Sequence, residues 1–185
     1  HHRYGKWVKN GQKFFRLATH PDERVAGESP GLIYSRLNNP NMEIVEDKIV
    51  VMQPGAEDAA VLPSGMSAIS TSILAMLNPG DSIIYSAPVY GGTEHLFDNI
   101  LPKFNIKCYP VYSLKMEEYE KLAEKHKDTL AMIFVETPTN PTIAHTDVEA
   151  VVKLAKKYST DKKRVLTAVD NTFMGPIFQN FFNVG

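Results

Sequence analysis

The chain has 185 residues, of which 43% are hydrophobic and 22% are charged, so it is large enough to fold around one sizeable core. Its 20 basic and 21 acidic residues give a formal net charge of -1, which offers no electrostatic basis for binding nucleic acid or an anionic membrane surface. No segment approaches the roughly 20 apolar residues of a membrane span, and a single cysteine cannot form an internal disulfide. We therefore expect a cytoplasmic protein with a small-molecule or protein partner, and we assign no metal site.

Residues 1–41 show no sustained period and are predicted to form an irregular amino-terminal arm. Within this arm Tyr34 and Arg36 are two residues apart, which places both on one face of an extended segment. A phenol and a guanidinium placed in this way can both donate to an anion such as phosphate. The alternative is that Arg36 is simply solvated, as exposed arginines usually are.

Helices and strands are predicted to alternate from residue 42 onward. A helical period places Ile44, Val45, Ile49 and Met52 on one face of a first helix over 42–52. Short apolar runs predict strands at 59–63, 82–86, 106–111, 130–135 and 165–169. Helices are expected at 68–77, after 93 to about 101, around 119–126 and at 147–158, the last with a capping box of Thr146 and Glu149. The predicted fold class is therefore α/β, with a mostly parallel sheet covered by helices on both faces.

The run 64–67 follows a predicted strand and opens a predicted helix. The amides of Gly65 and Met66 would then point out of a helix N-terminus, whose dipole favours an anion, with Ser64 beside them. The plain alternative is a strand-to-helix turn without a ligand. The run is neither a Walker A loop nor a three-glycine dinucleotide motif, which argues against a nucleoside triphosphate.

Further polar and aromatic residues follow the predicted strands, and the carboxyl ends of parallel strands share the edge where α/β proteins bind ligands. Tyr90 could stack on a flat cofactor from its Pro- and Gly-rich loop, or it could pack against the sheet. Asp170 would face the edge beside Thr172 and Asn140, unless it only caps a following helix. A carboxylate beneath a ring nitrogen keeps a pyridine protonated and electron-withdrawing. The combination indicates pyridoxal phosphate.

The motifs at 34–36, 64–66, 90–93, 136–141 and 169–173 together resemble the cystathionine gamma-synthase family. These are pyridoxal-phosphate enzymes of cysteine and methionine metabolism, and the resemblance runs from about residue 34 to the last residue. It implies the large domain of a fold type I pyridoxal-phosphate transferase, spanning 42–185 in part and preceded by the arm at 1–41. It also implies γ-elimination or γ-replacement on a sulfur amino acid or an activated homoserine.

The resemblance implies a role for the residues that hold the cofactor phosphate. Gly65 and Met66 would bind it through their backbone amides, and Ser64 belongs to the same cofactor-binding run. Tyr34 and Arg36 would reach the phosphate of a neighbouring subunit. A homodimer or homotetramer is therefore expected.

The resemblance also implies roles around the cofactor ring. Tyr90 and Asp170 would be the catalytic residues, the first stacking on the ring and assisting proton transfer at the leaving group, the second pairing with the pyridine nitrogen. Asn140 would contact the ring hydroxyl or the substrate carboxylate, and Thr172 would help to fix the ring. Glycine at position 92 favours a relative other than those methionine gamma-lyases that carry a cysteine at this place.

The family pattern also includes features that these residues lack. In the family, a lysine beyond the aspartate binds the cofactor covalently, and a C-terminal domain contributes substrate contacts. We therefore expect the chain to be part of a longer enzyme and to be inactive by itself. Two alternatives stay open, namely a non-catalytic oligomerising interaction module and another enzyme of the same fold, such as an aldolase or an aminotransferase.

Overall fold

The computed structural model describes Lys13, Arg16, His20, Glu23, Ser35, Arg36 and residues 39–184. The chain divides into two compact units, His1–Val50 with Asp58–Val61, and Val51–Glu57 with Leu62–Gly185. The division into an arm at 1–41 and a cofactor domain from 42 onward stays a prediction. None of the helices among the described residues has the length and apolar composition that crossing a membrane would require.

The first described helix, α2, extends from Pro40 to Met52. The sequence predicted that one face of this helix would be apolar, and the residues of that face are all exposed, namely Ile44, Val45, Ile49 and Met52.

The segment 59–63 was predicted to be a strand, and this prediction is wrong. Two of its amides are satisfied by carboxylates instead of a neighbouring strand: Ala59 donates to Asp58 at 2.8 Å, and Val61 donates to Glu46 at 2.8 Å. Pro63 has no amide hydrogen to offer a ladder. An apolar run alone therefore did not suffice to make a strand.

A parallel sheet forms the centre of the second unit. Its strands are β1 (Ser82–Ser86), β2 (Lys107–Val111), β3 (Leu130–Glu136) and β4 (Leu166–Asp170). They lie in the order β2-β1-β3-β4, and every pairing is parallel. The predicted α/β class with a parallel sheet is thus confirmed. The register places Glu136 of β3 opposite Asp170 of β4 at the carboxyl edge.

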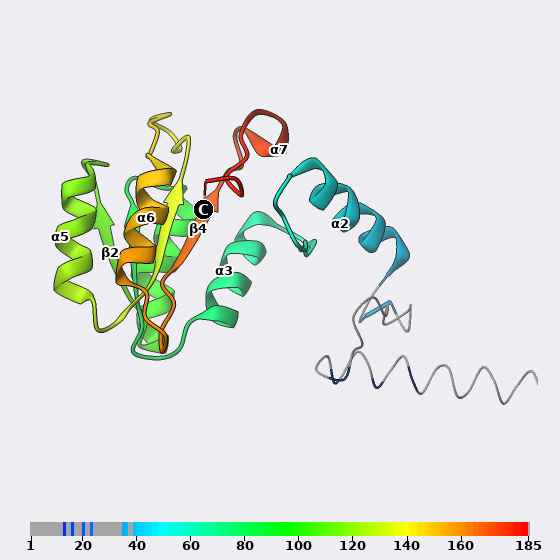
Figure 1. The fold of residues 1–185 in the computed structure, drawn as a ribbon, viewed down its shortest axis with the longest axis horizontal. Helices are drawn as coiled ribbons and strands as arrows, with labels where there is room; N and C mark the ends of the chain where they lie inside the picture. The colour runs from blue at the N-terminus through cyan, green and yellow to red at the C-terminus, as the bar shows by residue number, and fades with distance from the viewer. Residues whose placement is uncertain are drawn as a thin grey trace, which may run out of the picture. The chain divides into compact units, whose positions relative to one another are not determined.

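Helices cover both faces of this sheet because side chains alternate along each strand. On one face Ile83 and Tyr85 of β1 pack with α3 (Gly65–Met76) and with Phe97. On the other face Ile84 packs with α5 (Met116–His126) and α6 (Val148–Tyr158), which lie beside each other in Figure 1. Two cores therefore hold one sheet in place.

A helical stretch between β1 and β2 runs as α4 (Gly91–His95), a π-helical turn η2 (Leu96–Ile100) and a 3-10 turn η3 (Leu101–Phe104). It ends at Asn105, which adopts the left-handed conformation with φ 58°. The predicted helix to about Leu101 is thus present and slightly longer. A last short helix, α7, spans Gly175–Phe178.

The caps of two helices differ from the prediction. The run 64–67 is the first turn of α3 itself, because the Ser64 hydroxyl accepts from the Ser67 amide at 3.0 Å. The N-cap of α6 is Asp147, whose carboxylate accepts from Ala150 at 3.0 Å, and not the predicted box of Thr146 and Glu149. Both caps use a short polar side chain one helical turn before its backbone partner.

Candidate functional site

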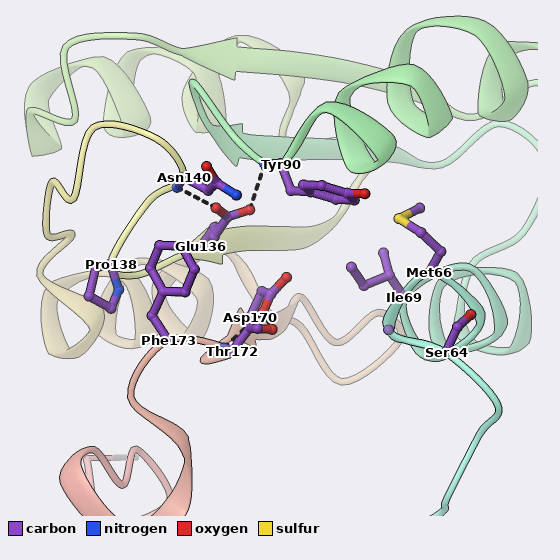
Figure 2. A pocket seen from close by; sticks show the side chains of 11 residues that line it. Ser64, Met66, Ile69, Tyr90, Glu136, Pro138, Asn140, Asp170, Thr172 and Phe173 are labelled. Atoms are coloured by element: carbon purple, nitrogen blue, oxygen red, sulfur yellow. Dashed lines mark hydrogen bonds between the residues drawn. The ribbon is translucent and has the colours of Figure 1, made fainter.

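A pocket of about 350 Å³ opens at the carboxyl edge of the sheet. It is lined by residues of α3, of the loops after β1 and β3, and of the segment after β4. Figure 2 shows the Tyr90 ring on one side of it and Asp170 with Thr172 on the other. Every predicted site residue except Tyr34 and Arg36 lines this pocket, namely Ser64, Gly65, Met66, Tyr90, Asn140, Asp170 and Thr172.

The N-terminus of α3 opens into the pocket with unused donors. The Ser67 amide bonds to the Ser64 hydroxyl, and the Ala68 amide bonds to the Ser64 carbonyl. Among the described residues no acceptor is found for the amides of Gly65 and Met66. A Cβ at position 65 would meet nothing within 4 Å, so the space beside this amide is open. These two donors are free to bind an anion.

Tyr90 precedes α4 and is 50% exposed. Its ring is held close to the backbone of Gly92, where a Cβ would come within 2.7 Å of Tyr90 Cε1 and 2.9 Å of Met66 Sδ. Glycine at position 92 therefore leaves the space that the ring and the thioether occupy.

Asp170 is the last residue of β4, and its two oxygens differ. The Thr172 amide donates to Oδ1 at 3.1 Å, and the Thr172 hydroxyl donates to the same oxygen at 2.5 Å. In the part of the chain that the structure describes, Oδ2 has no donor of its own. Thr172 thus orients the carboxylate, and one oxygen is left for a ligand.

Glu136 is a pocket residue to which the sequence analysis gave no role. It is 4% exposed, and it accepts from the Tyr90 amide through Oε2 at 2.7 Å and from the Asn140 amide through Oε1 at 2.6 Å. Burial raises the pKa of Glu136 and the nearby Asp170 raises it further, whereas the two amides lower it. Its place directly after an apolar strand, like that of Asp170, was the signal that could have identified it.

Further expectations concern the arm, the cysteine and metal binding. Tyr34 is outside the described residues, and Arg36 is exposed in the first unit. Partial burial raises the pKa of the Cys108 thiol to about 12, which suits a small side chain packed against the core and not a reactive thiol. Within the described residues no cluster of three or more His, Cys, Asp or Glu side chains is placed to hold a metal ion.

Comparison with known proteins connects this pocket to a family. The family model described as Cys/Met metabolism PLP-dependent enzyme matches residues 14–185. The chain belongs to this family. The resemblance predicted from the motifs is thereby confirmed, and members of the Cys/Met metabolism family are enzymes that use pyridoxal phosphate (PLP).

Relatives in the Cys/Met metabolism family carry several activities in their names. The chain is 37% identical over 169 residues to the cystathionine gamma-synthase/O-acetylhomoserine (thiol)-lyase of Bacillus subtilis (strain 168), a match that covers 91% of this chain and 43% of that protein. It is 32% identical over 171 residues to an L-methionine gamma-lyase of Fusobacterium nucleatum subsp. nucleatum, covering 92% of this chain and 41% of the relative. The chain thus spans less than half the length of these relatives.

A solved structure of the family has the same arrangement of elements. Cystathionine gamma-lyase from Lactobacillus plantarum, complexed with L-serine, superposes with a TM-score of 0.75 at 31% sequence identity. The superposition covers 88% of this chain and 40% of that one.

Proposed function

We propose that the pocket binds pyridoxal phosphate, and that the chain is the cofactor-binding part of an enzyme of cysteine and methionine metabolism. One observation carries the proposal. Two helix N-terminal amides without an acceptor among the described residues, an aromatic ring and a carboxylate oriented by Thr172 line one pocket of about 350 Å³. The groups fit a ligand with a phosphate at one end, a flat face and a basic ring nitrogen.

Each group would have a separate task toward this ligand. The Gly65 and Met66 amides would hold the phosphate, and Tyr90 would cover one face of the ring. Asp170 would accept a hydrogen bond from the pyridinium N–H at Oδ2, because Thr172 already occupies Oδ1. Asn140 would contact the ring hydroxyl or the substrate carboxylate.

Pyridoxal phosphate, when bound, supplies an electron sink for carbanions next to the amino-bearing carbon of an amino acid. Asp170 would keep its pyridine nitrogen protonated, and the Tyr90 hydroxyl would assist proton transfer at the leaving group. We propose that the intact enzyme eliminates or replaces the γ substituent of a sulfur amino acid or an activated homoserine, and that the 185 residues alone are inactive.

The proposal extends to the assembly and the location of the chain. Tyr34 and Arg36 would serve a neighbouring subunit in a homodimer or homotetramer. A single, half-buried cysteine supports a role in the reducing cytoplasm.

Equilibrium binding of pyridoxal phosphate to the chain tests the proposal. We expect the unaltered chain to bind it, and Tyr90→Ala to raise the Kd about fivefold to tenfold because a stacking contact of about 1 kcal/mol is lost. Inorganic phosphate should compete with the cofactor, since it would occupy the same two amides.

The matched control is Tyr112→Ala, because Tyr112 is an exposed tyrosine that does not line the pocket. Its Kd should equal that of the unaltered chain. No binding to the unaltered chain, or equal losses in both variants, would refute the proposal and leave the interaction module as the better explanation.

A further inference from the structure

Glu136 connects two loops of the pocket through one buried side chain. Its Oε2 accepts from the amide of Tyr90 in the loop after β1, and its Oε1 accepts from the amide of Asn140 in the loop after β3. Both distances, 2.7 and 2.6 Å, are short, as hydrogen bonds to an ionised acceptor are. Figure 2 shows both bonds converging on this carboxylate.

The carboxylate itself is fixed by the sheet. The Glu136 amide donates to the buried hydroxyl of Ser86 at 3.0 Å, which ties β3 to the end of β1. On the other side, Glu136 pairs in register with Asp170, and the next amide, that of Thr137, donates to the Asp170 carbonyl at 3.1 Å. Because the end of β3 is held by β1 and β4, the Glu136 carboxylate has a fixed position from which it binds both loops.

Ordinary packing does not account for an acidic residue at this place. A buried carboxylate without a nearby cation destabilises a fold. Among the residues that the structure describes, Glu136 has no ion pair, and the charged group that acts on it, Asp170, has the same sign. Glutamine would fill the same volume without charge, but its amide nitrogen is a donor and would face one of the two N–H groups. A carboxylate can accept at both oxygens, and that property is what the two loops require.

We propose that Glu136 is a positioning residue that fixes the Tyr90 and Asn140 loops relative to each other, so that both side chains face a bound ligand. This inference rests on the proposed function, since the ligand is pyridoxal phosphate. Glu136 lines the pocket, and its action is exerted through the backbone of the other two residues.

The first test is backbone amide hydrogen exchange in the chain without ligand. In Glu136→Gln we expect one of the two amides, Tyr90 or Asn140, to lose about tenfold in protection, because glutamine can accept from only one. In Glu136→Ala both should lose it. Amides within β3 should keep their protection in both variants. Unchanged protection at Tyr90 and Asn140, or an equal fall across the sheet, would overturn the proposal.

The second test is the affinity for pyridoxal phosphate. Glu136→Gln should raise the Kd about tenfold. The control is Asp147→Ala, which removes another bond between a carboxylate and a backbone amide, but at the start of α6 and away from the pocket lining. Its Kd should not change.

The two tests separate the possible failures. If the unaltered chain binds no pyridoxal phosphate, the proposed function fails and this role of Glu136 fails with it. If the unaltered chain and Glu136→Gln bind equally well, only the role of Glu136 is refuted. Should Glu136→Gln not fold, Glu136→Asp keeps the charge, is too short to span both amides, and should show the same loss at one of them.

Discussion

At the scale of single residues, Glu136 combines a proposed function in ligand positioning with a cost in stability. Glu136 is buried and lies near a second carboxylate, and in the described part of the chain no ion pair is found for it, yet it has bonds to two amides. Burial raises the pKa of such a group, whereas its bonds to the two amides lower it. The burial of Glu136 therefore has a cost, which its two hydrogen bonds offset in part.

We predict that Glu136 makes the free energy of unfolding decrease as the pH rises. Burial raises the pKa of Glu136 above its ordinary value of 4.5. A carboxyl with a raised pKa in the folded chain stabilises the fold fully below the unfolded pKa, and this contribution is lost as the pH rises through the folded pKa. Glu136→Gln cannot titrate, so it should lack the decrease. Urea unfolding of both proteins from pH 4.5 upward measures it.

The comparison isolates Glu136, because every other residue is the same in both proteins. The stability of the unaltered chain relative to Glu136→Gln should therefore fall with rising pH. A difference that stays constant, or that grows in favour of the unaltered chain, would show that burial does not disfavour the charged form.

At the scale of elements, the short helix α4 determines where the Tyr90 ring lies. Gly92, in its first turn, would bring a Cβ to 2.7 Å from the Tyr90 ring and 2.9 Å from Met66. We predict that Gly92→Ala displaces the ring, destabilises the fold by about 1–3 kcal/mol and raises the Kd for pyridoxal phosphate about tenfold. Urea unfolding and equilibrium binding measure the two effects.

The neighbouring Gly91 provides the control for this prediction. A Cβ at position 91 would meet nothing within 4 Å, so Gly91→Ala adds a methyl group to the same helix without a clash. Its affinity and stability should stay close to those of the unaltered chain. If both variants behave alike, the helix backbone matters and the space at Gly92 does not.

The elements that the sequence predicted well are those whose signal is local. The apolar strands became β1 to β4, and the helical period around Tyr119 became α5. The run at 59–63 failed because its amides are used by carboxylates, one of them on Glu46, 15 residues before Val61. The cap of α6 was misplaced by one residue, since Ser, Thr and Asp all cap helices and the run contains two of them.

The candidate site was predictable in part for a similar reason. Asp170 and the amides of Gly65 and Met66 follow from a strand end and a helix start, which are visible in a single sequence. The role of Glu136 depends on an acceptor meeting the Tyr90 amide 46 residues away, and no local pattern encodes this contact.

At the scale of the whole molecule, the stability of the second unit depends on hydrophobic cores on both faces of its sheet. Phe97, 1% exposed, contacts Tyr85 of β1 and Phe134 of β3 edge-on, with ring centroids 4.7 and 5.2 Å apart. We predict that Phe97→Ala destabilises the unit by about 3–5 kcal/mol, because the large ring leaves a cavity among rigid strands. Urea unfolding measures the loss.

Phe104 allows a matched comparison, because it is the same residue type in the same helical stretch but is 51% exposed. Phe104→Ala should change the free energy of unfolding by less than about 1 kcal/mol. Equal losses in the two variants would contradict the assignment of the core.

The unequal oxygens of Asp170 have a consequence for the direction from which a ligand can arrive. Both Thr172 donors bond to Oδ1, so Oδ2 is the carboxylate oxygen that is left to accept from a ligand. A flat heterocycle that donates a hydrogen bond there would have its in-plane orientation set by this one oxygen. Thr172, two positions after the end of β4, would in this way orient the ring, although it contributes no atom to the hydrogen bond between the ring and Asp170.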